Sequence, residues 1–136
     1  MIKNIERLQK KTDQPVPSCL SIMEPEIVEY HPGKSLTLSF PVLDMYLNGN
    51  KVMQGGFIAA AFDNVFGVLS FLEKENINMS TIDLQVNYHR PLTAGDRLVI
   101  TAYLKHCGNT ILGLYAECFN SEGKLAATAT TNIILA

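Results

Sequence analysis

A glycine pair and a single acid stand out in the most apolar part of the chain. From Gly55 to about Leu72 nearly every residue is apolar, and Asp63 lies inside this run. If the run is a helix, its first turn presents unpaired N–H groups and a partial positive charge. Gly55 and Gly56 have no Cβ atom to keep a ligand away from that backbone. Such a helix start could bind a polarised carbonyl oxygen, as an oxyanion hole does.

Asp63 is too far from this helix start to act on the same oxygen within one chain. Eight residues of α-helix span about 12 Å. Two copies of the helix packed antiparallel about a two-fold axis would bring Asp63 of one copy to Gly55 of the other. The alternative is a structural acid that a donor from the partner subunit satisfies. For a lone buried acid with no other motif, the structural interpretation is favoured.

The apolar run also limits where the helix can lie. A helix that is apolar on all sides is buried in a membrane or in a protein core. Asp63 and Asn64 interrupt the run, and Glu73 and Lys74 close it before a span of roughly 20 apolar residues is reached. We therefore expect a core helix wrapped by the rest of the fold, with no membrane partner.

The second half of the chain predicts four strands. Between residues 80 and 88 polar and apolar residues alternate, which is typical of a half-buried strand. The polar face is Thr81, Asp83, Gln85 and Asn87, and the apolar face is Ile82, Leu84, Val86 and Tyr88. Further strands are predicted over residues 97–105, 110–119 and 125–135, with Gly- and Asn-containing turns between the last three.

Upstream of the helix, residues 20–30 and 35–40 are predicted to form a hairpin, and Pro25 indicates an edge strand or a bulge. Residues 2–11 are predicted to form a short helix. The pattern favours one α+β domain over residues 1–136, with 1–18 as an N-terminal helix and loop. Its long helix packs against one curved antiparallel sheet of about six strands. Since one helix covers only one face and leaves a long edge strand, we expect a homo-oligomer.

Composition excludes several classes of function. The formal net charge is -2, 47% of the residues are hydrophobic, and the Lys and Arg residues are scattered, so no nucleic-acid partner is expected. Cys19, Cys107 and Cys118 are far apart and form no CxxC pair, which favours reduced thiols in a cytoplasm and no metal site. The first residues lack the apolar core of a secretory signal.

Residues 48–67, NGNKVMQGGFIAAAFDNVFG, resemble the hot-dog-fold acyl-CoA thioesterases of the phenylacetate-pathway (PaaI-like) type, and the resemblance extends from about Ile22 to the C-terminus. In that family the central helix begins at a His-Gly-Gly motif, carries an acid further in and is wrapped by an antiparallel sheet. The resemblance implies a hot-dog fold and four catalytic residues: Asp63, Gly55, Asn48 and Thr81.

The resemblance also implies a role for each of these residues. The Gly55 N–H polarises the thioester carbonyl, and Thr81 helps to position the water. Asp63 acts as a general base or as a nucleophile that forms a transient anhydride, and the residues favour neither mechanism. Asn48 matches the Asn that precedes the motif, but it could instead serve only an Asx-turn in its loop.

The family's ligand, CoA, would lie along the turn after the strand that ends at Tyr88 and along the turn at residues 106–110. There Arg90 and His106 could meet its phosphates. The substrate-binding residues implied in this way are Gln54, Gly56, Tyr88, Arg90, His106, Gly108, Asn109 and Thr110. CoA is part of the substrate, so no separate cofactor is expected. The implied assembly is a dimer of dimers with active sites at the dimer interface.

Gln54 departs from the family pattern, which usually has His before the two glycines. Gln can donate a hydrogen bond to a carbonyl, but it cannot exchange a proton near neutral pH. This weighs against a hydratase or dehydratase, which would need a His paired with an acid. The preferred function is hydrolysis of an aryl or medium-chain acyl-CoA. A non-catalytic acyl-CoA-binding or sensor protein and an enzyme for acyl carrier protein stay open as alternatives.

Overall fold

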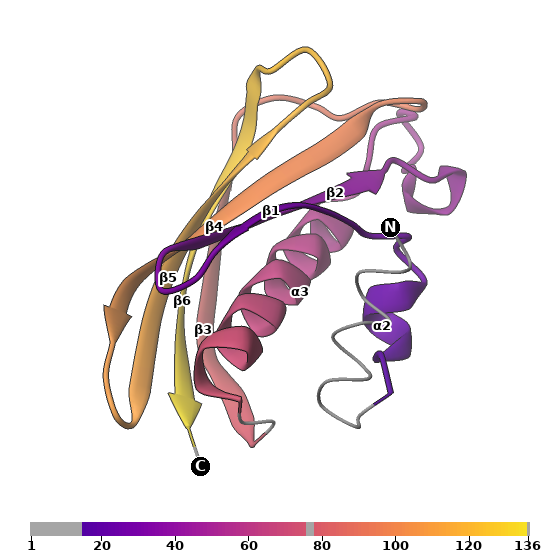
Figure 1. Ribbon diagram of the computed structural model, residues 1–136. Helices are drawn as coiled ribbons and strands as arrows, with labels where there is room; N and C mark the ends of the chain where they lie inside the picture. The colour runs from indigo at the N-terminus through magenta and orange to yellow at the C-terminus, as the bar shows by residue number, and fades with distance from the viewer. Residues whose placement is uncertain (1–14, 76–77, 136) are drawn as a thin grey trace.

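The computed structural model describes residues 15–75 and 78–135, and Figure 1 shows their arrangement. The helix predicted over residues 2–11 lies outside the described residues. In chain order the elements are α2 (Ser18–Ser21), β1 (Glu26–His31), β2 (Ser35–Pro41), η1 (Asp44–Tyr46), α3 (Gly55–Lys74), β3 (Met79–Tyr88), β4 (Arg97–Cys107), β5 (Ile111–Phe119) and β6 (Leu125–Leu135).

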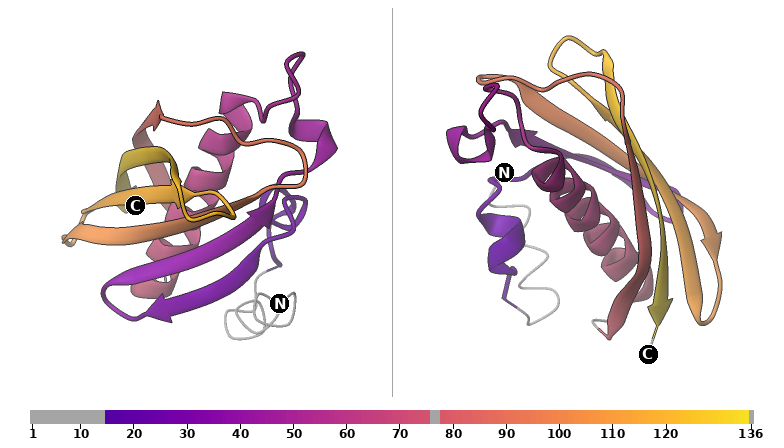
Figure 2. Two further views of the ribbon diagram at one scale, coloured as in Figure 1. Left: turned by 90° about the horizontal axis from the view of Figure 1, so that it is seen from above. Right: turned by 180° about the vertical axis from the view of Figure 1, so that it is seen from behind.

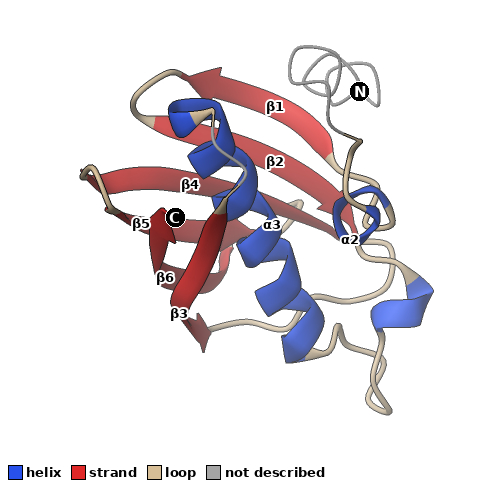
Figure 3. Ribbon diagram, turned by 90° about the horizontal axis from the view of Figure 1, so that it is seen from below, coloured by secondary structure: helices blue, strands red, loops and turns tan. Residues whose placement is uncertain are grey.

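The six strands form one sheet in the order β1-β2-β4-β5-β6-β3, and every neighbouring pair is antiparallel. Because the chain passes from α3 to the edge opposite β1, β1 and β3 are the two edge strands. The helix α3 crosses one face of the curved sheet, as the views in Figures 2 and 3 show. The predicted α+β architecture, one long helix on one curved antiparallel sheet of six strands, is confirmed.

One face of α3 forms the centre of the core. Its buried residues recur every three or four positions, as the helical period requires; they are Ile58, Ala61, Phe62, Val65, Phe66, Leu69 and Ser70. Burying each large apolar side chain contributes about 1.5–3 kcal/mol. By length and hydropathy alone α3 could span a membrane, but a core helix passes the same test. The other face of α3 is open in the single chain, because Gly56, Phe57, Ala60 and Asp63 are exposed.

The strand predicted over residues 20–30 begins too early. Ser18–Ser21 is a short helix, and Leu20 and Met23 are both buried at the three-residue spacing of a helical face. Glu24 then adopts a left-handed backbone with φ of 54°, so the extended backbone of β1 can begin only after this residue. β1 is an edge strand and carries a bulge between Ile27 and Glu29, so the expected edge position is confirmed, although Pro25 precedes the strand.

A bulge in β3 changes which residues face the helix. Thr81 pairs with Ile133 of β6, and Asp83 pairs with the next residue back, Asn132, so Ile82 is the extra residue between the two pairs. Paired residues of a sheet share a face. Ile133 is buried and Asn132 is exposed. Thr81 therefore faces α3 and Asp83 faces outward, whereas plain alternation predicted that both would lie on one face.

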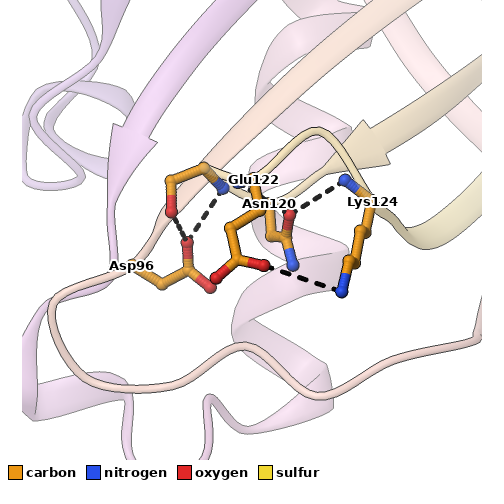
Figure 4. A network of polar contacts seen from close by, with 5 residues as sticks. Asp96, Asn120, Glu122 and Lys124 are labelled. Atoms are coloured by element: carbon orange, nitrogen blue, oxygen red, sulfur yellow. Dashed lines mark hydrogen bonds and ion pairs between the residues drawn. The ribbon is translucent and has the colours of Figure 1, made fainter.

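A polar network joins the turn before β4 to the turn between β5 and β6 (Figure 4). The Asp96 carboxylate accepts hydrogen bonds from the Ser121 hydroxyl at 2.6 Å, the Ser121 amide at 2.9 Å and the Arg97 amide at 2.8 Å. Burial alone would raise the pKa of Asp96, but these three hydrogen bonds outweigh it and hold the pKa below its ordinary value. Asn120 accepts from the amides of Glu122 and Lys124 in the same turn.

The C-terminal end of α3 is tied to the β1–β2 hairpin through one carboxylate. Glu73 Oε1 accepts a hydrogen bond from the Tyr30 hydroxyl at 3.0 Å and from the Gly33 amide at 2.6 Å. Burial, together with the hydrogen bond and the charge of Glu73, raises the pKa of Tyr30 to about 12. This contact fixes the helix end that lies opposite the glycine pair.

Tyr30→Phe should reveal this contact in the pH dependence of stability. Because the folded-state pKa of Tyr30 lies above the ordinary tyrosine value of 10.0, the contact stabilises the fold fully below pH 10 and is lost as the pH rises toward 12. At pH 7 the variant should lose about 1 kcal/mol of unfolding free energy in urea titrations. Between pH 10 and 12 its stability should fall less steeply than that of the wild type. Equal slopes for the two proteins would contradict the assignment.

Candidate active site

The loop before α3 is shaped by Asn48. Its Oδ1 atom accepts hydrogen bonds from the amides of Asn50 at 2.9 Å and Val52 at 3.3 Å, and its own amide donates to the Val52 carbonyl at 2.8 Å. The Met53 amide donates to the Leu92 carbonyl at 2.8 Å, which ties the loop to the segment before β4. Asn48 thus forms the Asx-turn that was one of its two interpretations, and its catalytic role stays a prediction.

The first turn of α3 has two free backbone donors. The Gln54 carbonyl accepts from the amides of Phe57 at 3.0 Å and Ile58 at 3.3 Å. The amides of Gly55 and Gly56 find no acceptor among residues 15–75 and 78–135. The Gln54 side chain is exposed and does not cap the helix. The helix start therefore offers two N–H groups and the positive end of the helix dipole to a ligand oxygen.

Tyr46, which was not predicted as a site residue, supports the first turn of α3 through two contacts. Its carbonyl accepts the Gln54 amide at 2.8 Å, and its ring lies 4.9 Å from the Phe57 ring, centroid to centroid. Only 2% of the Tyr46 surface is exposed. Burial, followed by the charge of Glu24, raises the pKa of its phenol. No spacing pattern in the sequence marks a single aromatic residue in a loop for such a role.

Tyr88, at the end of β3, contacts the first residue of α3. Its hydroxyl donates a hydrogen bond to the Gly55 carbonyl at 2.7 Å. A Cβ atom at residue 55 would lie 3.0 Å from Cζ of the Tyr88 ring, whereas a Cβ atom at Gly56 would meet nothing within 4 Å. Gly55 is therefore needed to admit the Tyr88 ring, and Gly56 leaves open space beside the free amides.

Asp63 is held from β3 by Thr81. The Thr81 hydroxyl donates to Asp63 Oδ1 at 3.3 Å, and the carboxylate is exposed. This contact depends on the bulge at Ile82, which turns Thr81 toward the helix. The next residue, Asn64, faces α2 instead: its Nδ2 atom donates to the Cys19 carbonyl at 3.0 Å and lies 3.3 Å from the Met23 sulfur. Asp63 therefore contacts β3, whereas Asn64 contacts the segment that contains α2.

Five of the predicted catalytic and substrate-binding residues form two groups along α3. Gly55 and Gly56 lie at its start, where Tyr88 of β3 contacts it. Asp63 lies two turns further along, about 12 Å away by helix geometry, where Thr81 of β3 contacts it. Gly56 and Asp63 are both on the exposed face of α3. One chain therefore holds the donor and the acid of a site without bringing them together, as their spacing in the sequence predicted.

The predicted CoA-binding turns lie at opposite ends of the sheet in one chain. The amides of His89 and Arg90 both donate to the Ala126 carbonyl at the start of β6, whereas the Leu135 amide at the end of β6 donates to the Thr110 carbonyl. Nine residues of strand separate these two points by about 30 Å. Arg90 therefore lies far from the turn that contains His106, Gly108, Asn109 and Thr110, and one chain does not combine them.

The three cysteines are free: Cys19 and Cys107 are exposed, and Cys118 is buried. Burial, with a smaller contribution from the charge of Asp96, raises the pKa of the Cys118 thiol to about 12. Among the residues that the structure describes, no group of three His, Cys, Asp or Glu side chains is placed to hold a metal ion.

Comparison with known proteins identifies the family. The profile of the thioesterase superfamily matches residues 50–127, a range that contains α3, Asp63 and Thr81. Over 99 residues, 62% of this chain and 63% of the relative, the sequence is 30% identical to the medium/long-chain acyl-CoA thioesterase YigI of Escherichia coli.

Solved structures agree with this assignment at the level of the fold. The PaaI protein from the phenylacetic acid degradation operon of Escherichia coli superimposes with a TM-score of 0.81 over 88% of this chain and 85% of that one, at 21% identity. A hypothetical thioesterase protein of Streptococcus pneumoniae, solved with coenzyme A, has a TM-score of 0.77 over 86% and 90% of the two chains, at 22% identity.

The chain belongs to the thioesterase superfamily, because the family profile covers more than half of it. Its structural neighbours are PaaI-like thioesterases with the same hot-dog fold, so the predicted family is confirmed. The chain is accordingly a thioester hydrolase. The roles of its individual residues remain predictions.

The two glycines should respond differently to alanine. Gly56→Ala adds a methyl group in open space and should stabilise the protein by about 0.4–1 kcal/mol, because alanine restricts the unfolded chain. Gly55→Ala should show no such gain, since its Cβ displaces the Tyr88 ring and weakens a hydrogen bond worth about 1 kcal/mol. Urea titrations of both variants test this. An equal gain in both would show that Tyr88 does not restrict residue 55.

Proposed function

We propose that the protein hydrolyses acyl-CoA thioesters to a free acid and CoA, with Asp63 as the catalytic carboxylate and the Gly55 N–H as the donor to the thioester oxygen. The observation that carries this proposal is the exposed face of α3. It presents an acid held by Thr81 and, about two turns earlier, two backbone amides with no acceptor among the described residues. These are the two electrostatic components that thioester hydrolysis needs.

A two-fold axis would bring these components together. The exposed face of α3 carries the small residue Ala60 between Gly56 and Asp63, which allows a second helix to approach closely. Packing two copies antiparallel at this face would place Asp63 of each against the Gly55 amide of the other and would give two equivalent sites. We therefore propose a homodimer with its active sites at the interface, and a dimer of dimers as the full assembly.

The open edge of the sheet supports the same arrangement. β3 is ten residues long, and Ile82 and Tyr88 are each more than half exposed, at 53% and 52%. A long apolar edge is a ready site for strand pairing. If two β3 edges met antiparallel, the Tyr88 end of one would lie beside the Met79 end of its partner. The same axis would then bring Arg90 to the end of the sheet where the partner's β4–β5 turn lies. The turn after β3 in one chain and the β4–β5 turn in the other could then bind one CoA molecule together.

The proposed reaction begins when the thioester carbonyl accepts a hydrogen bond from Gly55 at the helix start. Asp63 then removes a proton from water as the water attacks the carbonyl carbon, or attacks that carbon itself to form an anhydride that water hydrolyses. In the first route the C–S bond breaks as the tetrahedral intermediate collapses, and the proton taken by Asp63 passes to the sulfur, so CoA leaves as the thiol. In the second route the C–S bond breaks when the anhydride forms and CoA leaves as the thiolate; water then cleaves the anhydride to the acid and the Asp63 carboxylate, and the second proton of that water goes to the thiolate. The Thr81 hydroxyl orients the carboxylate or the water. Gln54 can add a hydrogen bond but no proton transfer.

Two comparisons support acyl-CoA as the substrate: the name of YigI, and the coenzyme A bound to the pneumococcal neighbour. Within this class we propose an aryl or medium-chain acyl group, because small residues at positions 59–61 leave room beside the helix start. A cytoplasmic location is part of the same proposal, as sequence features alone support it.

Asp63→Asn should lower kcat/KM for acyl-CoA hydrolysis at least about a hundredfold. Because Asp63 is exposed, the unfolding free energy should change by no more than about 0.5 kcal/mol. Release of CoA thiol from a panel of aliphatic and aryl acyl-CoAs measures the loss. Glu29→Gln is the matched control. It also replaces a carboxylate by an amide, but at an exposed position on β1, the edge strand opposite β3, and it should retain full activity.

Two results would contradict the proposed function. Turnover that survives in Asp63→Asn would exclude Asp63 as the catalytic group. Binding of acyl-CoA by the wild type without any turnover would instead favour the sensor alternative, to which Gln54 points.

Mixing two inactive variants should restore activity if each site takes its parts from two chains. Gly55→Pro removes the amide donor, and its Cβ also displaces the Tyr88 ring, so it disables the donor half of the site and leaves Asp63 in place. The extended backbone of Gln54, with ψ of 137°, suits a following proline at the first helical position. Coexpression of Gly55→Pro with Asp63→Asn should give mixed dimers in which one of two sites is intact, and roughly a quarter of wild-type activity. If the two variants stay inactive together, each site lies within one chain.

A further inference from the structure

The hydrogen bond from Tyr88 acts on a peptide group that the proposed mechanism has not used. The Gly55 carbonyl, which accepts the Tyr88 hydroxyl at 2.7 Å, belongs to the same peptide group as the Gly56 N–H. The two ends of a planar trans peptide are coupled by resonance. A donor at the oxygen draws electron density from the nitrogen and so makes the N–H a stronger donor. The Tyr88 hydroxyl therefore polarises the Gly56 amide.

The Gly56 amide is accessible to a ligand. It has no acceptor among the described residues, and a Cβ atom at this position would meet nothing within 4 Å. It is adjacent to the Gly55 amide on the first turn of α3. Two neighbouring N–H groups at a helix start can bind a single oxygen between them.

The Tyr88 hydroxyl is well placed to fix this peptide group because its backbone belongs to the sheet. Tyr88 pairs with Ala127 of β6, and the next two amides, His89 and Arg90, both donate to the Ala126 carbonyl. The ring lies against Gly55, where a Cβ atom would come within 3.0 Å of it. With 52% of its surface exposed, Tyr88 is not a core residue, so its contact with α3 is not explained by burial.

We infer that Tyr88 is a positioning residue that fixes the Gly55–Gly56 peptide and strengthens the Gly56 N–H as a second donor to the thioester oxygen. This inference rests on the proposed function. Negative charge develops on that oxygen as the tetrahedral intermediate forms, so a stronger donor stabilises the transition state more than the bound substrate. Loss of the hydroxyl should therefore lower kcat and leave KM nearly unchanged.

Tyr88→Phe tests the inference because it keeps the ring and removes only the hydroxyl. We expect kcat to fall roughly tenfold, less than the hundredfold or more that follows loss of a whole oxyanion donor. KM should stay within about twofold. Tyr115→Phe is the matched control: Tyr115 is 39% exposed on β5 and stacks on Tyr103. Its neighbours Leu114 and Ala116 are buried, so it faces away from α3, and this variant should match the wild type.

A second measurement needs no substrate. In an amide NMR spectrum of the ¹⁵N-labelled protein, Tyr88→Phe should shift the Gly56 amide proton upfield, and Tyr115→Phe should leave it in place. An unchanged kcat, or a loss confined to KM, in Tyr88→Phe would overturn the inference. If the wild type has no turnover, the proposed function fails first. The Gly56 shift then decides the local claim by itself, and an unmoved resonance would overturn it.

Discussion

The burial of one face of α3 against the sheet is the contact on which the rest of the structure depends. Phe62, Val65 and Phe66 are fully buried, and a helix that places them inward has no freedom left to rotate. Asp63 follows Phe62 by one residue, or about 100° of helical turn, so the same packing directs its carboxylate outward. The position of the acid is therefore set by apolar contacts that do not include it. Hydrogen bonds from Tyr30 and Gly33 to Glu73 then fix the last turn of the helix, and the hydrogen bond from Tyr88 to Gly55 fixes the first.

Much of this architecture could be predicted from the sequence because periodicity is a strong signal over long elements. The helix from Gly55 and the strands of the second half were found with small errors at their ends. The segment at residues 20–25 was misread, since a short helix there depends on the burial of Leu20 and Met23, which a four-residue pattern cannot reveal. The acid and the glycines could be selected by their chemistry. Thr81 and Tyr88 were selected only through the family resemblance, and their contacts with Asp63 and Gly55 could not be read from any pattern, because these contacts are tertiary.

The two glycines illustrate how one motif can combine two physical requirements. In the sequence they form a uniform pair that permits close approach of a ligand. In the structure Gly55 is matched to an aromatic ring from the sheet, and only Gly56 faces open space. Asn48 is a similar case, because its side chain is occupied in shaping the loop before the helix. The residues around a helix start can thus be essential for its shape while the backbone itself provides the donors.

The bulge at Ile82 reverses the alternation of β3, so that different residue numbers face α3 before and after it. Before it, an odd-numbered residue, Thr81, faces the helix; after it, the even-numbered residues Leu84, Val86 and Tyr88 do, each paired with a buried residue of β6. If Ile82 were instead part of a regular strand, Thr81 and Tyr88 would lie seven residues apart and on opposite faces, so only one of them could face α3. The bulge thus lets a single edge strand serve both the acid and the donor end of the helix. Without the bulge, the same sequence would direct one half of the strand to the other face.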